Sequence, residues 1–174
     1  MKSTRNLTLS GLFLALGVAL PFLIMHVSQL GEALLPMHIP VLLCGFVCGW
    51  PWGLAVGFIT PLLNSVLTGM PPLAYGLVMA FELAAYGALS GLLYRLLPKT
   101  APCLYLALLG AMLGGRIIWG LAMLVFTGGQ FGFQGFLAGA FVTAALGIVI
   151  QIVLIPILIL ALRRTKLMPG EMQA

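Results

Sequence analysis

Two ionisable side chains, Glu82 and Arg116, stand inside long apolar runs of this sequence. A charge within a membrane span is costly, so such residues usually pair with one another or take part in binding and transport. Tyr75, Glu82 and Tyr86 share one face of a predicted helix, because steps of three and four residues return to the same side. A carboxylate flanked by phenols could receive a polar ligand, whereas an ion pair with Arg116 would fix two neighbouring helices. The two roles can coexist.

A stripe of uncharged polar residues, Thr60, Asn64 and Thr68, recurs every four residues along another apolar run. Such a stripe could hydrogen-bond a substrate, or it could link helices, as Asn and Thr commonly do in membranes. Gln151 is a similar residue in the last apolar run, deeper toward the cytoplasm. Because the stripe approaches a predicted outer loop, Asn64 is a candidate for ligand contact.

His38 lies at the mouth of an apolar stretch, in LLPMHIPVLLCG at residues 34–45. It could contact a substrate at the rim of a pocket, or it could be a polar residue solvated at the membrane boundary. A metal site is the weakest alternative, because one histidine with buried cysteines supplies too few ligands for square-planar Ni²⁺ or Co²⁺. We therefore expect no metal and no cofactor.

The composition excludes an ordinary soluble domain. Of the 174 residues, 62% are hydrophobic and 6% are charged, whereas soluble domains are about 25% charged. The sequence has no G-x-x-x-x-G-K-[ST] loop and no Ser-His-Asp or H-E-x-x-H arrangement, so we expect neither ATP hydrolysis nor an enzyme. Topology explains the net charge of +5, so no nucleic-acid partner is indicated.

Six apolar runs predict six spanning helices, since a span needs about 20 mostly apolar residues. The runs lie at about residues 7–25, 39–49, 52–67, 73–97, 104–126 and 133–162. Lysine and arginine occur before the first run, between the fourth and fifth, and after the sixth, which puts both termini in the cytoplasm. We expect an all-α integral membrane protein with one six-helix domain at residues 1–166 and a disordered cytoplasmic tail at residues 167–174.

Small residues form one flank of the first predicted helix, where Gly11, Ala15 and Ala19 recur every four residues. A face with so little side chain lets another helix approach closely. The partner helix could belong to the same chain, which is the commoner case, or to another protein. The stripe therefore predicts a packing face without naming its partner.

Three segments carry a family resemblance: LPMHIPVLLCGFVCG, TPLLNSVLTGMPPL and FELAAYG. With the short six-span layout and A-x-x-x-A at Ala15 to Ala19, they resemble the substrate-binding S component of energy-coupling factor (ECF) transporters, the modular vitamin importers of bacteria. The resemblance implies a multi-pass protein of the bacterial cell membrane that captures a small vitamin outside. It also implies that the small-residue face docks on a separate coupling protein of the EcfT type, which is joined to two cytosolic ATPases.

By position, the resemblance puts the binding site near the outer surface, among the loops at residues 26–38, 68–73 and 127–132. The residues carried over are Glu32, His38, Asn64, Met70, Glu82, Arg116 and Gln130. Tyr75, Tyr86 and Trp119 add aromatic surface close to the charges. Arg116 would suit a carboxylate such as that of pantothenate, and Glu82 would suit a protonated ring nitrogen such as that of a pyridoxine-like vitamin. The sequence does not decide between these two vitamins.

Two other functions fit parts of the pattern. In a helix-packing scaffold protein, the polar residues would only link helices, and the small-residue face would drive homodimerisation. In an autonomous secondary transporter, Glu82 would be the proton-coupling group. The sequence lacks the internal inverted repeat often seen in such carriers, which favours the S component.

Overall fold

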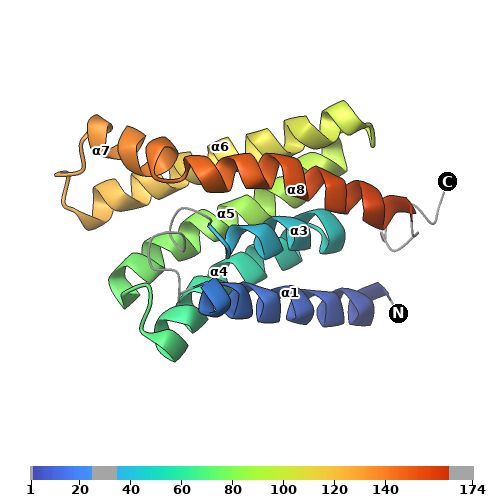
Figure 1. The fold of residues 1–174 in the computed structure, drawn as a ribbon, viewed down its shortest axis with the longest axis horizontal. Helices are drawn as coiled ribbons and strands as arrows, with labels where there is room; N and C mark the ends of the chain where they lie inside the picture. Colours follow the sequence, from blue (N-terminus) through green and yellow to red (C-terminus); the bar gives the residue numbers. More distant parts are fainter. Residues whose placement is uncertain (1, 25–34, 165–174) are drawn as a thin grey trace.

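The computed structural model describes residues 2–24 and 35–164, which are helical nearly throughout and contain no strand. This confirms the all-α prediction, and Figure 1 shows the helices running roughly along one common direction. The predicted tail at residues 167–174 lies outside the described residues. The helices are α1 (Lys2–Ile24), α3 (His38–Cys48), α4 (Trp50–Thr68), α5 (Leu73–Leu96), α6 (Ala101–Phe126), α7 (Phe133–Leu137), the π-helix η1 (Ala138–Val142) and α8 (Ala145–Arg164).

Five of the described helices, α1, α4, α5, α6 and α8, are long and apolar enough to cross a membrane. The second predicted span corresponds to α3, which has 11 residues. At 1.5 Å per residue it is only about 16 Å long, roughly half of a bilayer's hydrocarbon core. All of its residues except Ile39 are buried, so α3 is an interior helix. The count of six spans therefore stays a prediction.

The sixth apolar run is not one helix, so that part of the prediction was wrong. The run begins as α7, passes into η1 and continues as α8. The amide of Thr143 donates to the carbonyl of Ala138 at 3.0 Å, a spacing of five residues that is typical of a π-helix. A Cβ atom on Gly139 would stand 2.6 Å from the Trp119 ring, so the irregular turn leaves room for that indole.

Glycines hold α4 and α5 in backbone contact. A Cβ atom added to Gly87 would stand 2.1 Å from the carbonyl oxygen of Gly53, and one added to Gly57 would stand 2.2 Å from the carbonyl oxygen of Leu83. Only glycine permits such an approach, because any other residue would place its Cβ inside the neighbouring backbone. This contact fixes α5 against α4 and thereby fixes the position of Glu82 in the bundle.

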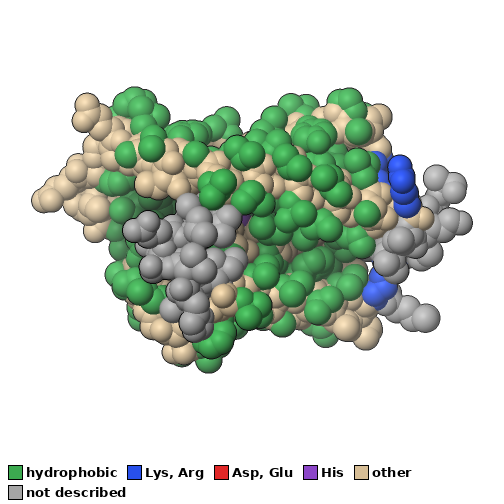
Figure 2. Space-filling view, viewed as in Figure 1, with side chains coloured by type: hydrophobic (Ala, Val, Ile, Leu, Met, Phe, Trp, Pro, Cys, Tyr) green, Lys and Arg blue, Asp and Glu red, His purple; other side chains and the backbone are tan. Residues whose placement is uncertain are grey.

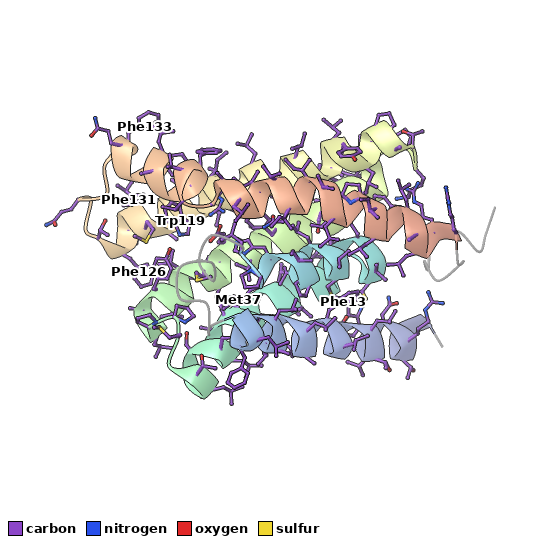
Figure 3. The ribbon with its side chains drawn as sticks, in the orientation of Figure 1. Phe13, Met37, Trp119, Phe126, Phe131 and Phe133 are labelled. Atoms are coloured by element: carbon purple, nitrogen blue, oxygen red, sulfur yellow. The ribbon has the colours of Figure 1, made fainter. Side chains whose placement is uncertain are left out.

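The two ends of the bundle differ in chemistry. Both termini lie at the same end, and the Lys and Arg side chains visible in Figure 2 gather there. At that end Arg163 donates to the Tyr94 hydroxyl and to the carbonyl of Lys99, which joins α8 to the end of α5 and to the loop before α6. Aromatic side chains occupy the opposite end, where Figure 3 shows Trp119, Phe131 and Phe133.

Candidate functional site

The two charges predicted inside the membrane meet in the interior of the bundle. Arg116 on α6 donates from Nη1 to Oε1 of Glu82 on α5 at 2.9 Å. His38, the first residue of α3, places Nε2 3.4 Å from the same oxygen. These side chains are 1–5% exposed. We call Glu82, Arg116 and His38 the charged cluster; three helices supply one residue each.

The charged cluster lies well inside the bundle. Glu82 is nine residues from the start of α5, or about 14 Å from that end at 1.5 Å per residue. Arg116 is ten residues from the end of α6, or about 15 Å from it. The helix α3 begins at His38, at the same depth as the two charges, and this explains why it is short. Its N-terminal end, which carries partial positive charge, favours a carboxylate there.

Tyr86 covers the charged cluster from α5, one turn beyond Glu82. Its ring meets the His38 imidazole edge to face, with 5.0 Å between the ring centroids. The ring also lies against α6, because a Cβ atom on Gly115 would stand 2.3 Å from Tyr86 Cδ2. Gly115 is therefore what lets Tyr86 and Arg116 sit side by side.

Several buried polar atoms near this site have no hydrogen-bond partner in the part of the chain that the structure describes. They are Nε and Nη2 of Arg116, Nδ1 of His38, and both amide atoms of Gln151. Burying a polar group without a partner costs about 1–3 kcal/mol, more when it is charged. Such groups are therefore candidates for ligand contact. Gln151 was recognised in the sequence only as a polar residue in a span; its complete burial in α8 adds it to the candidates.

A cavity of about 260 Å³ lies beside Arg116 and is open on one side, where the lining residues Leu109, Leu113 and Phe141 are exposed. Residues of α5, α6, η1 and α8 line it, and its lining is almost wholly apolar. The lining residues are Tyr86, Leu109, Met112, Leu113, Arg116, Phe141 and Ile148. Gln151 lies one turn beyond Ile148 on the same face of α8. An apolar cavity with a few convergent polar groups is typical of small-molecule sites.

Asn64 makes helix-linking bonds, one of the two roles that the sequence left open, while its Oδ1 has no hydrogen-bond partner among the described residues. Its Nδ2 donates to the carbonyl of Gly17 on α1 at 3.2 Å and to the carbonyl of Thr60 on its own helix at 3.1 Å. Thr60 itself donates to the carbonyl of Val56 at 2.6 Å. These bonds join α4 to α1, which accounts for the buried part of the polar stripe.

His38 is not a solvated boundary residue or a rim residue, so that interpretation was wrong. Its side chain is 1% exposed, because Glu82 and Tyr86 hold it in the interior. The error has a simple cause: α3 starts within the bundle instead of at its surface.

The remaining predicted contacts are not in the charged cluster. Met70 and Tyr75 are 58% and 41% exposed, and Gln130 is also exposed. Trp119 is buried, but it packs in a separate aromatic group at the far end, 5.4 Å between ring centroids from Phe131. Glu32 lies outside the described residues. The sequence predicted these residues to lie together because their loops lie at the same end of the bundle. The position of each side chain depends on how the helices pack, which the sequence does not show.

The small-residue face of α1 points away from the chain. Gly11, Ala15 and Ala19 are all exposed, and a Cβ atom on Gly11 would meet nothing within 4 Å. Gly17 instead makes the close contact, where a Cβ atom would stand 2.8 Å from Thr60. A partner helix within the described chain, the commoner case, is therefore excluded.

Apolar helices long enough to span a membrane, packed around a buried ion pair, define a polytopic α-helical membrane protein with a charged cluster in an apolar interior. The family described as ECF transporter, substrate-specific component, matches residues 5–159. The chain belongs to this family, which confirms the resemblance seen in the sequence and makes it a transport component. Searches of curated proteins and of solved structures return no match.

Proposed function

We propose that this protein is the substrate-capture subunit of an ECF-type vitamin importer in the bacterial cell membrane. It binds a small water-soluble vitamin from outside, with pantothenate and a pyridoxine-like vitamin as the candidates. The observation that carries the proposal is the charged cluster beside the 260 Å³ cavity, with unpartnered donors on Arg116, in a chain of the S-component family. Family membership alone does not indicate where a ligand binds; the cavity and the unpartnered donors of Arg116 support a site at this place.

The ends of the bundle support an orientation for uptake. The end with both termini carries the basic side chains and would be cytoplasmic, because positively charged segments are retained on that side. The aromatic end would then face outside. A vitamin entering from there would travel about 15 Å along the helices to reach Arg116.

The exposed face of α1 supports delivery through a partner. Gly11, Ala15 and Ala19 leave a strip of helix with little side chain, open to a helix from another protein. We assign this face to a separate EcfT-type coupling protein, joined to two cytosolic ATPases that supply the energy. The sequence contains no nucleotide-binding loop, and we therefore assign ATP hydrolysis to these partners.

Binding without ATP tests this function. The purified protein in detergent is titrated with pantothenate and with pyridoxine by calorimetry, in the absence of nucleotide and of any other subunit. We expect saturable binding of one molecule per chain. A scaffold protein would bind neither vitamin and would release no small molecule on denaturation, and that combined result would refute the proposal.

A further inference from the structure

The Arg116 guanidinium has one occupied position and one open edge. Nη1 donates to Glu82, whereas Nε and Nη2 have no hydrogen-bond partner among the residues that the structure describes. Nε and Nη2 form one side of the planar guanidinium, and their two N–H bonds run parallel. That side matches the two oxygens of a carboxylate, which accept such a pair of bonds together.

The open edge is buried, and Arg116 is among the residues that line a space large enough for a ligand. Arg116 is 5% exposed, so water does not freely replace the missing acceptors. It is also a lining residue of the 260 Å³ cavity, whose other walls are apolar side chains such as Met112, Phe141 and Ile148. A buried guanidinium with two unpartnered donors, on a residue that lines a cavity, favours a ligand with an anionic group.

The Oε1 atom of Glu82 does not offer an equivalent site for a cation. Its Oε1 already accepts from Arg116 at 2.9 Å and lies 3.4 Å from His38 Nε2. A cationic ligand approaching this carboxylate would stand beside the guanidinium, and like charges in a low-dielectric interior repel strongly. Glu82 thus holds Arg116 in place, and His38 gives Glu82 a second partner.

We infer that the ligand is a small organic acid, whose carboxylate accepts hydrogen bonds from Nε and Nη2 of Arg116 and whose body occupies the cavity beside Tyr86. The inference rests on the proposed capture function and narrows it. It selects the carboxylate-bearing class over vitamins with a protonated ring nitrogen. Because a guanidinium carries five N–H donors, Arg116 can serve Glu82 and the ligand together.

Matched ligand pairs test the inference. Wild-type protein in detergent is titrated with pantothenate and pantothenol, with nicotinate and nicotinamide, and with thiamine as a cation. Small molecules released on denaturation are identified by mass spectrometry. Within a pair that binds, we expect the acid to bind about ten- to a hundredfold tighter than its neutral twin, the usual range for hydrogen bonds to a charged group.

The variant Arg116→Lys separates the side-on contact from simple charge. Lysine keeps the positive charge beside Glu82 but is a point charge without the parallel donor pair. We expect the acid to lose at least about tenfold in affinity, while its neutral twin changes little. Arg95→Lys, the same substitution at an exposed site on α5, is the matched control and should leave both affinities unchanged. Melting temperatures of both variants show whether the fold is retained.

The outcomes distinguish the inference from the function it rests on. If the acid is preferred or a released molecule is an organic acid, and Arg116→Lys removes that preference, the inference holds. The assignment to an organic acid is wrong if an acid and its neutral analogue bind equally, if thiamine binds best, or if the released molecule is a cation or neutral. In each of these cases the proposed capture function still stands. If nothing in the panel binds and nothing is released, capture itself is wrong.

Discussion

The buried ion pair is the feature whose removal has the most specific expected effect. Glu82→Gln keeps the shape of the carboxylate but removes its charge, which leaves the Arg116 guanidinium unbalanced. Arg116→Met removes the guanidinium and leaves Glu82 with His38 as its remaining partner in the charged cluster. Both side chains are at most 5% exposed, so solvent cannot compensate for the lost partner. Removing one member of a buried pair costs about 3–5 kcal/mol, and we expect each single variant to be destabilised by this order.

The double variant, Glu82→Gln with Arg116→Met, removes both charges and therefore leaves neither uncompensated. We expect its loss of unfolding free energy to fall short of the sum of the two single losses by about 1–3 kcal/mol, the coupling typical of residues in direct contact. The 2.9 Å distance between Nη1 and Oε1 supports a value toward the upper end. Without this coupling, the contact between Glu82 and Arg116 would contribute nothing to the stability of the protein.

Equilibrium unfolding in detergent micelles measures the free energies of unfolding for this double-mutant cycle. Added denaturant shifts the population toward the unfolded state, and fluorescence of the three tryptophans reports it. The four proteins, wild type, two singles and the double, are compared under one condition. Strict additivity of the two single losses would refute the reasoning, since it would mean that Glu82 and Arg116 do not stabilise one another.

Three further predictions concern helix packing and docking. Gly87→Ala should strongly destabilise the protein, because its Cβ atom would collide with the backbone of α4, whereas Gly11→Ala, inside α1 with open space around it, should not lower the melting temperature. Unchanged melting of the Gly87 variant would contradict the close α4–α5 contact. Asn64→Leu should lower the free energy of unfolding by about 0.6–1.7 kcal/mol through loss of its bond to α1, measured by the same denaturant titration; no loss would contradict that link. Ala15→Leu should abolish vitamin uptake in cells while leaving binding to the purified protein intact, and a parallel loss of both would argue against a docking face.

The helices were largely predictable because hydrophobic length and basic flanks carry most of the information about membrane spans. Glu82 and Arg116 were also predictable, since a charge in an apolar run has few ways to be satisfied. Their pairing was one of two open roles, and the structure shows the pair directly. What the sequence could not show is that one edge of Arg116 remains open beside a cavity, because that depends on how α6 and α8 pack.

The errors share a physical cause. His38 was placed at a boundary because an apolar run began there, yet α3 begins in the interior, where neighbouring helices exclude water. The last run was read as one helix because its composition is uniformly apolar; the π-turn at Gly139 depends on the Trp119 ring from α6. Periodicity describes one segment at a time, and both features are set by contacts between segments.

The central claim is that Arg116, in the charged cluster, holds a small molecule without help from ATP or other subunits. Native mass spectrometry of the protein purified from cells measures this directly, as the number of small molecules retained per chain. We expect wild-type protein to retain one molecule and Arg116→Met to lose it while its helical circular dichroism is preserved. Equal retention by the folded Arg116→Met variant, or no retained molecule in wild type even after vitamins are added, would contradict the account.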